Sequence, residues 1–233
     1  GAGGSIGSEL CRQIVANKPA KLLMLDRYEN GLHSVAVELN RDAPTTSIKT
    51  IVADISDPFL MRRIFESERP SLVFHAAAHK HVPLMEENVL EAIKNNVLGT
   101  KTLVDIACQY GVAHFVMIST DKAVRPISVM GMTKKVCESY IMRMSKRTST
   151  RCSVVRFGNV LGSNGSVVPL FRQQVEQGGP VTVTHPDMKR YFMLISEAVH
   201  LVLQAACVSN GGDILILEMG VEVRVFEMAK KLI

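Results

Sequence analysis

The stretch Gly1-Ala2-Gly3-Gly4-Ser5-Ile6-Gly7 decides the fold, because its glycines at positions 1, 4 and 7 lead straight into a helical pattern. Apolar residues at positions 6, 10 and 14 share one face of a helix predicted over Ser5–Asn17. Glycines at such a turn let the backbone approach a pyrophosphate, and the helix N-terminus behind them faces the anion. The stretch therefore predicts a dinucleotide-binding turn made by Gly1, Gly4, Ser5, Ile6 and Gly7.

Two later carboxylates support a dinucleotide site. Asp26 ends an apolar run 19 residues after Gly7, where an acidic side chain holds the adenosine ribose diol. Asp54 and Ile55 follow the next apolar run, and we expect Asp54 to end that strand beside the adenine. Asp26 favours NAD because a carboxylate repels a 2′-phosphate, while the neighbouring Arg27 leaves NADP open.

Short apolar runs alternate with longer amphipathic stretches along the chain. The predicted strands are Lys21–Leu25, Ser47–Val52, Leu72–His75, His114–Ser119 and Ser153–Phe157. The other predicted helices are Asn30–Arg41, Pro58–Glu68, Val89–Tyr110, Gly131–Lys146, Val168–Gln177 and Glu197–Val208. This alternation predicts an α/β fold, a Rossmann-like doubly wound parallel sheet with helices on both faces.

The pattern loosens after about residue 160, where Pro169, the Gly178-Gly179-Pro180 stretch and Pro186 break it into short pieces. We predict an NAD(P)-binding domain over residues 1–158 and a smaller nucleotide-sugar-binding lobe over 159–233, from which the chain returns to the sheet. The glycine turn normally follows a strand. The first strand is therefore expected upstream of Gly1, in a longer parent protein.

Composition excludes several classes of protein. With 47% hydrophobic and 21% charged residues and a net charge of +5, the 233-residue chain is not disordered. Five cysteines without a CxxC spacing argue against a disulfide framework or a zinc site, and for a cytoplasmic catalytic domain. A diffuse positive charge and 5% aromatic residues argue against a nucleic-acid partner.

Polar residues follow two further predicted strands. After the strand ending at His75, the backbone of Ala76, Ala77 and Ala78 is expected to lie against the cofactor. Lys80 and His81 come next and predict a loop that binds a polar substrate. This interpretation is favoured over a metal site of His75, His79 and His81, which no carboxylate joins at ligand spacing, so no metal is expected.

The segment Ser119-Thr120-Asp121-Lys122, followed by Met130 and Lys134, resembles the extended short-chain dehydrogenase/reductase family. That family has a glycine-rich turn, a ribose aspartate, a strand-end Ser or Thr, and Tyr-x-x-x-Lys on one helix face. The resemblance implies that Asn95, Ser119 and Lys134 contact the cofactor. Met130 stands where tyrosine is expected, and a thioether cannot transfer a proton. Either catalysis is lost and the chain is a non-catalytic NAD(P)-binding regulator, or other residues supply the acid and the base.

A closer resemblance favours the second interpretation. The sequence is similar to nucleotide-sugar 4,6-dehydratases, in particular the large UDP-N-acetylglucosamine 4,6-dehydratases of bacterial capsule, O-antigen and protein glycosylation pathways, which have Met in place of Tyr. The segments that carry the similarity are Gly1–Leu10, Phe74–Glu87, Ser119–Lys135, Arg156–Pro169 and Thr182–Ala198. An inverting 4,6-dehydratase and a C4 epimerase remain alternatives, although a Tyr is expected in both.

The resemblance implies a lyase that oxidises the sugar at C4, eliminates water across C5 and C6, and returns the hydride to C6. The cofactor is then regenerated in each turnover and stays tightly bound. We expect Asp121 to be the general acid, with a pKa raised by burial, and Lys122 the base at C5, with a lowered pKa. Neighbouring strand residues face opposite ways, so both reach one substrate only if the strand ends and turns at Asp121. The acceptor of the C4 hydroxyl proton is left open among Thr120, Asp121 and Lys122, while Met130 packs against the sugar or the nicotinamide.

The resemblance also implies a UDP-sugar site in the lobe. Asn159 and Arg190 would contact the diphosphate, and Thr182-Val183-Thr184 would form a short strand along the uracil. The remaining substrate contacts are expected at Lys80, His81, Ser163 and Val167. Relatives of this type often pair through the helices predicted over Val89–Tyr110 and Gly131–Lys146 and carry membrane spans, so we expect a homo-oligomer, a dimer or higher, and a parent anchored in the bacterial inner membrane.

Overall fold

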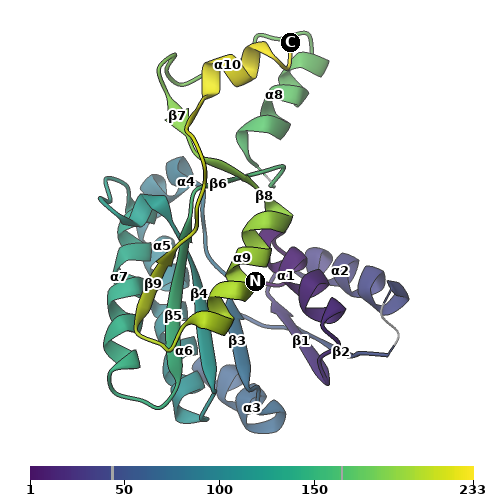
Figure 1. Ribbon diagram of the computed structural model, residues 1–233, viewed down its shortest axis with the longest axis vertical. Helices are drawn as coiled ribbons and strands as arrows, with labels where there is room; N and C mark the ends of the chain where they lie inside the picture. The colour runs from purple at the N-terminus through teal and green to yellow at the C-terminus, as the bar shows by residue number, and fades with distance from the viewer. Residues whose placement is uncertain (43–44, 164) are drawn as a thin grey trace.

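The protein is described by a computed structural model that covers residues 1–42, 45–163 and 165–233 (Figure 1). The sheet strands are β1 (Lys21–Asp26), β2 (Ser47–Val52), β3 (Leu72–His75), β4 (His114–Thr120), β5 (Arg151–Phe157) and β9 (Asp213–Ile216). β1 pairs with β2, and the others form a parallel sheet in the order β3-β4-β5-β9. The predicted α/β fold and its parallel sheet are confirmed.

Helices cover both faces of this sheet, as Figure 1 shows. They are α1 (Ser5–Ala16), α2 (Glu29–Asp42), α3 (Pro58–Glu68), α6 (Gly99–Gln109), α7 (Val129–Ser145) and α9 (Ile195–Val208). Alternate residues of β4 enter two different cores. Phe115 and Met117 pack with α3, α6 and α7, whereas Val116 and Ile118 pack with α1 and α9. β4 is buried along six of its seven residues, which explains why its sequence is a continuous apolar run without polar alternation.

β1 and β3 share no backbone pairing in the described ranges, so the sheet falls into two parts. In a doubly wound sheet the strand before the glycine turn lies between the strands that correspond to β1 and β3. The strand expected upstream of Gly1 therefore stays a prediction with a defined place in the sheet.

The prediction of one continuous helix over Val89–Tyr110 is wrong. The segment is divided into α5 (Val89–Ala92), a π-helix η1 (Ile93–Leu98) and α6, and a further helix α4 (Val82–Glu87) precedes it. The π-helix inserts an extra residue per turn and so turns Asn95 and Asn96 into the interior, where both are buried. The period-3.6 pattern of the sequence does not reveal such an insertion.

The lobe stands above the carboxyl ends of the strands in Figure 1. It contains β6 (Asn159–Leu161), α8 (Val167–Glu176), β7 (Lys189–Arg190), β8 (Phe192–Leu194), β10 (Val223–Arg224) and α10 (Val225–Lys230). From it the chain returns to the sheet through α9 and β9, and β9 pairs with β5. The domain boundary at 158/159 stays a prediction. No helix within the described ranges is both long and apolar enough to cross a membrane.

Candidate functional site

The glycine turn packs too closely for a side chain at Gly1, Gly3 or Gly7. Gly4 caps the N-terminus of α1, and a Cβ on Gly7 would lie 1.8 Å from the carbonyl oxygen of Gly1. A Cβ on Gly1 would lie 2.5 Å from the backbone nitrogen of Ala77, in the loop after β3. The turn thus presents bare backbone at the N-terminus of α1, which is the arrangement that a pyrophosphate requires. The site therefore fits a dinucleotide.

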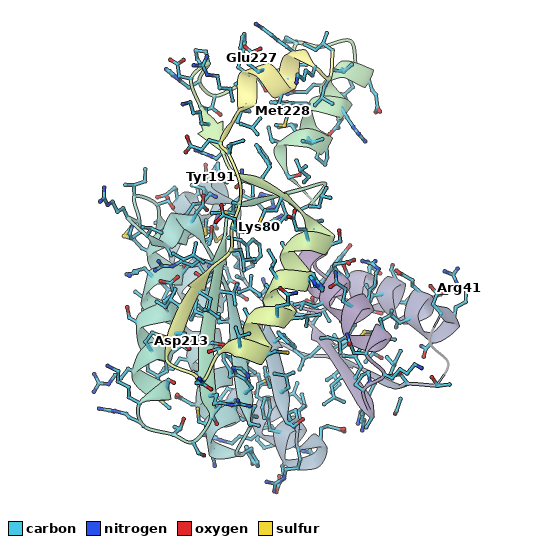
Figure 2. All side chains as sticks on the ribbon, in the orientation of Figure 1. Arg41, Lys80, Tyr191, Asp213, Glu227 and Met228 are labelled. Carbon is cyan, nitrogen blue, oxygen red and sulfur yellow. The ribbon has the colours of Figure 1, made fainter. Side chains whose placement is uncertain are left out.

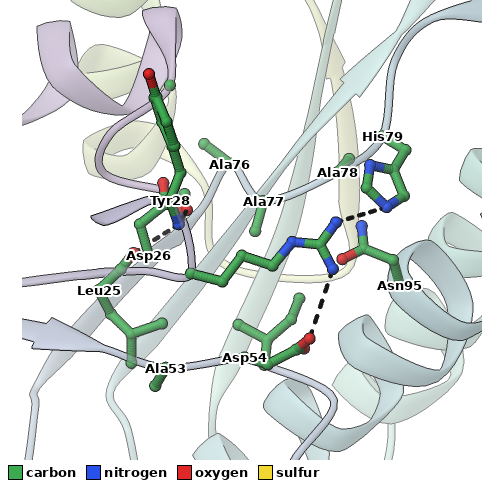
Figure 3. A pocket seen from close by; sticks show the side chains of 14 residues that line it. Leu25, Asp26, Tyr28, Ala53, Asp54, Ala76, Ala77, Ala78, His79 and Asn95 are labelled. Atoms are coloured by element: carbon green, nitrogen blue, oxygen red, sulfur yellow. Dashed lines mark hydrogen bonds and ion pairs between the residues drawn. The ribbon is translucent and has the colours of Figure 1, made fainter. Parts of the chain in front are cut away.

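Beside this turn lies a cavity formed by the loops at the carboxyl ends of β1, β2 and β3 (Figure 3). It brings together ten of the predicted cofactor residues: Gly1, Gly4, Asp26, Arg27, Asp54, Ile55, Ala76, Ala77, Ala78 and Asn95. Sequence reasoning missed four other residues of its lining, Leu25, Tyr28, Ala53 and His79. Ser5, Ile6, Gly7, Ser119 and Lys134 do not line it. The cofactor role of all these residues stays a prediction.

Two carboxylates are held at different edges of the cavity. Asp26 accepts hydrogen bonds from the backbone nitrogens of Gly3, at 2.8 Å, and Tyr28, at 2.9 Å. Asp54 lies two residues beyond the end of β2, so the expectation that it ends the strand is wrong. Burial favours a higher pKa for Asp54, but hydrogen bonds from Ser56 and the charge of Arg27 outweigh it and lower the pKa. The carboxylate is therefore ionised at neutral pH.

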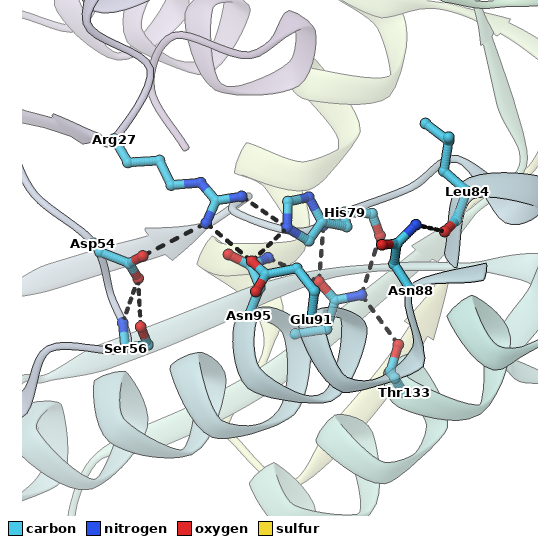
Figure 4. Close-up of polar contacts among 10 residues, drawn as sticks. Arg27, Asp54, Ser56, His79, Leu84, Asn88, Glu91, Asn95 and Thr133 are labelled. Carbon is cyan, nitrogen blue, oxygen red and sulfur yellow. Dashed lines mark hydrogen bonds and ion pairs between the residues drawn. The ribbon is translucent and has the colours of Figure 1, made fainter. Parts of the chain in front are cut away.

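Asn96 fastens the loop after β3, and sequence reasoning missed it. Its Oδ1 accepts a hydrogen bond from the backbone nitrogen of His79 at 2.8 Å, and its Nδ2 donates to the carbonyl oxygen of His79 at 3.1 Å. Nδ2 also donates to Thr133 Oγ1 at 3.1 Å (Figure 4). Thr133 lies on α7 and in turn donates to the carbonyl oxygen of Met130. Asn96 thus joins the cofactor loop to the helix that carries Met130 and Lys134.

The three polar residues after β4 form a hydrogen-bonded chain. Thr120 Oγ1 donates to Asp121 Oδ1 at 2.8 Å, and Lys122 Nζ donates to the same oxygen at 2.9 Å. Lys122 Nζ also donates to Asn159 Oδ1 at 3.1 Å, which reaches the lobe. β4 ends at Thr120 and a 3-10 turn η2 (Asp121–Ala123) follows, so the predicted turn is present and both side chains reach one site.

The predicted rise of the Asp121 pKa is wrong for the chain by itself. Burial favours a higher pKa, but the ammonium of Lys122 and hydrogen bonds from Lys122 and Thr120 outweigh it and lower the pKa. Sequence reasoning considered burial without the partner's charge. Asp121 is therefore an ionised carboxylate in the chain by itself.

Met130 and Lys134 lie one turn apart on α7. Met130 is 4% exposed and packs with Met85 and Ala92. Lys134 Nζ donates a hydrogen bond to the carbonyl oxygen of Ile118 on β4 at 2.8 Å. Complete burial lowers the pKa of Lys134, with the thiol of Cys137 and the carboxylate of Glu138 acting in the opposite direction.

A buried ion pair that sequence reasoning missed connects α7 to the sheet. Glu138 is fully buried and accepts hydrogen bonds from Arg156 Nε on β5 and Ser119 Oγ on β4, both at 2.7 Å. Arg156 also bonds the second oxygen of Glu138, so the contact is bidentate. The pair fixes α7, and with it Lys134, against β5, while the bond from Ser119 joins the same carboxylate to the end of β4.

A second cavity lies within the lobe. It is lined by Asn159, Val167, Leu170, Phe171, Thr182, Val183, Thr184, Met188, Arg190 and Val225, of which five are predicted substrate residues. The short strand expected over residues 182–184 is absent from the structure, which describes these residues. Instead the side chain of Gln174 bonds Thr182, from Nε2 to Oγ1 at 2.8 Å and from the Thr182 nitrogen to Oε1 at 3.0 Å.

The other predicted substrate residues lie between the two cavities. Lys80 Nζ donates to Ser163 Oγ at 3.4 Å, and Figure 2 places Lys80 near Tyr191, where the lobe joins the sheet. Burial lowers the pKa of Lys80. The ring of His81 lies against Gly165, where a Cβ would come within 2.5 Å of it. Among the described residues, no three His, Cys, Asp or Glu side chains form a group that could hold a metal ion.

The chain belongs to the polysaccharide biosynthesis protein family, whose profile matches residues 1–233. It is 51% identical over 234 residues to the probable polysaccharide biosynthesis protein EpsC of Bacillus subtilis and 50% identical over 235 residues to the capsular polysaccharide biosynthesis protein CapD of Staphylococcus aureus. Each match covers the whole chain and 39% of the relative, so the chain spans about two fifths of their length.

Solved structures share the fold. DesIV, a dTDP-glucose 4,6-dehydratase from Streptomyces venezuelae with NAD and TYD bound, has a TM-score of 0.90 at 22% identity, over 100% of this chain and 78% of that one. Other neighbours of the same fold are named UDP-glucose 4-epimerase. The chain thus shares its fold with nucleotide-sugar dehydratases and epimerases whose structures contain NAD or a UDP-sugar.

Proposed function

We propose that the chain is the catalytic domain of an NAD-dependent nucleotide-sugar 4,6-dehydratase that acts on UDP-N-acetylglucosamine. The observation that carries this proposal is the hydrogen-bonded chain of Thr120, Asp121 and Lys122 at the end of β4. It supplies an acid and a base in a site where Met130 replaces the usual tyrosine. A simple dehydrogenase needs one proton acceptor, whereas elimination of water needs an acid and a base together.

The proposed cofactor is NAD, with Asp26 at the adenosine ribose and Lys134 at the nicotinamide ribose. When bound, it takes up the hydride from the sugar C4 and gives it back to C6. The bare backbone at Gly1 and Gly7 and the bonded carboxylate of Asp26 support this assignment. The Ala76-Ala77-Ala78 loop lines the cavity without long side chains, which would let its backbone lie against the cofactor.

The proton transfers that we propose use only Thr120, Asp121 and Lys122. As C4 is oxidised, the hydroxyl proton passes to Thr120 Oγ1, which gives its own proton to the Asp121 carboxylate 2.8 Å away. The lowered pKa of Asp121 supports this order, because the carboxylate is ionised before the reaction starts. Asp121 then protonates the C6 hydroxyl, which leaves as water.

Lys122 is the proposed base at C5. Its Nζ lies between Asp121 Oδ1 and Asn159 Oδ1, which orient it. The ammonium that lowers the pKa of Asp121 belongs to the chain without substrate, so the proposal requires Lys122 to release that proton to solvent as the sugar binds. As the free amine it then removes the C5 proton, and it gives the same proton back to C5 when the hydride returns to C6. One proton thus travels from O4 to the departing water and the other returns to its carbon, so that the residues end as they began.

The lobe cavity is the proposed site of the nucleotide. Arg190 has the planar fork that suits a diphosphate, and the apolar wall of Phe171 and Val225 suits a flat base. Lys80, half-buried beside Ser163, adds a positive charge between the two cavities. We further propose that the domain faces the cytoplasm in a homo-oligomeric parent anchored in the inner membrane.

The test is incubation of the full-length protein with UDP-N-acetylglucosamine, followed by mass spectrometry and NMR. We expect loss of one water and a 4-keto-6-deoxy sugar, whose C5 configuration separates retaining from inverting catalysis. Asp121→Asn and Lys122→Ala should each abolish elimination, while Lys146→Ala, an exposed lysine at the end of α7, should not. A C4 epimer would indicate an epimerase instead, and no product with bound NAD would indicate a regulator.

A further inference from the structure

Arg27 extends across the cofactor cavity and ends among acidic side chains. Its Nη1 lies 3.5 Å from Asp54 Oδ2 and 3.5 Å from Glu91 Oε1. Its Nη2 lies 2.7 Å from His79 Nε2, and that nitrogen is itself 3.3 Å from Glu91 Oε1 (Figure 4). The three partners come from the loop after β2, the loop after β3 and α5. The guanidinium is therefore held by side chains from three elements, and two of these side chains are carboxylates that balance its charge.

This position directs Arg27 away from Asp26, although the two residues are neighbours in the sequence. Asp26 and His79 lie at opposite sides of the cavity in Figure 3. The two oxygens of Asp26 accept from the backbone nitrogens of Gly3 and Tyr28, and among the described residues no hydrogen bond or ion pair joins Asp26 to Arg27. An arginine next to the ribose carboxylate is the residue type that accepts the 2′-phosphate of NADP. In this structure the guanidinium of Arg27 instead contacts Asp54, Glu91 and His79.

We propose that Glu91, acting together with Asp54, selects NAD over NADP by holding the guanidinium of Arg27 away from the ribose 2′ position. Glu91 lies outside the cavity lining and acts through Arg27, so it is a positioning residue. This inference rests on the cofactor part of the proposed function. The sequence leaves open whether Asp26 or Arg27 sets the preference between NAD and NADP. The inference answers this with Glu91, which lies 64 positions from Arg27 in the chain and is brought to it only by the fold.

The test uses Glu91 and not Asp54, since Asp54 lines the cavity and its loss would disturb both dinucleotides. Affinities of the cofactor-free full-length protein for NAD⁺ and NADP⁺ are measured by calorimetry, and again for 5′-ADP and 2′,5′-ADP, which differ only in the 2′-phosphate. Glu91→Gln removes the charge and keeps the shape. Glu87→Gln, at the exposed end of α4, removes the same charge near the site without touching Arg27.

In Glu91→Gln we expect the ratio of Kd for NADP⁺ to Kd for NAD⁺ to fall about tenfold, the size of one charge-assisted hydrogen bond to a phosphate. The ratio should stay at the wild-type value in Glu87→Gln and return to it when Arg27→Gln is added to Glu91→Gln. An unchanged ratio in Glu91→Gln, or an equal fall of the ratio in Glu87→Gln, overturns the inference about Glu91. In that case, NAD⁺ binding by the wild type still upholds the cofactor assignment. A wild-type chain that binds neither dinucleotide overturns both.

Discussion

Asn96 bonds both backbone groups of His79, accepting from its nitrogen at 2.8 Å and donating to its carbonyl oxygen at 3.1 Å. A side-chain amide that pairs in this way supplies the hydrogen bonds that a neighbouring strand would give, to a loop that has no such strand beside it. His79 lies between contacts to both parts of the protein. Its ring contacts Arg27 in the first cavity, and the next residue, Lys80, donates to Ser163 in the lobe. The π-helix that presents Asn96 thus helps to position the loop after β3, which carries the predicted cofactor and substrate residues.

Asn96→Ala should therefore loosen the loop and destabilise the fold. Removing the buried amide takes away the partner of the backbone nitrogen and carbonyl oxygen of His79, which costs about 1–3 kcal/mol in the free energy of unfolding. We also expect KM for the sugar nucleotide to rise. Urea unfolding and steady-state kinetics measure the two effects. Asn88→Ala, which loses one bond from an exposed amide to Leu84, is the matched control and should change neither. Equal stability of the two variants would contradict the role given to Asn96.

The buried pair of Glu138 and Arg156 predicts a large, asymmetric effect on stability. Glu138→Gln leaves the guanidinium of Arg156 buried without a counter-charge and should cost about 3–5 kcal/mol. Replacing both residues, Glu138→Leu with Arg156→Met, should cost less, because no charge is left unpaired. The exposed pair of Glu227 and Lys230 is the control, and Glu227→Gln should cost less than about 1 kcal/mol. A double variant that is less stable than the single one would show that the pair is a net stabiliser.

Stability should fall as the solution becomes acidic, because His75 is buried as the neutral ring. Burial holds the pKa of His75 well below its usual value, and repulsion from Lys134 acts in the same direction. The unfolded chain takes up a proton near pH 6.5 and the folded chain does not, so the stabilisation is present above that pH. It is lost as pH falls towards the folded pKa, by up to about 1.4 kcal/mol per pH unit. His114, whose pKa is also lowered by burial, adds an effect of the same sign.

Urea unfolding between about pH 7.5 and pH 5 measures this slope. His75→Gln removes the titrating ring and should reduce the slope, leaving the contribution of His114. His33→Gln, at an exposed position of α2, should keep the wild-type slope. If His75→Gln retained the full slope, the buried ring would not be the source of the acid sensitivity.

The sequence predicts the central strands well because β4 and β5 are buried along nearly their whole length and are therefore rich in apolar residues. β2 and β3 were placed to the residue, and β1, β4 and β5 to within two. The prediction failed where tertiary contacts override local pattern. The π-helix at Ile93–Leu98 depends on bonds that Asn96 makes to distant residues, which the local pattern does not contain. Likewise, Thr182 bonds the side chain of Gln174 and not a neighbouring strand. The pKa of Asp121 depends on the position of the Lys122 ammonium, which no sequence pattern contains.

Met130 yields the sharpest test of how this site works without the usual tyrosine. The side chain is buried beside Met85 and Ala92, and its thioether has no proton to give or take. If its role is packing, Met130→Leu conserves volume, should cost less than about 1.5 kcal/mol and should leave kcat/KM within a few-fold of wild type. Met132→Leu, on the exposed face of the same helix, is the control. Lys134→Met, four residues along α7, should instead weaken NAD binding, because it removes the ammonium assigned to the nicotinamide ribose. Loss of activity in Met130→Leu with intact folding would mean that the sulfur itself contacts the reacting groups and that its role is not packing alone.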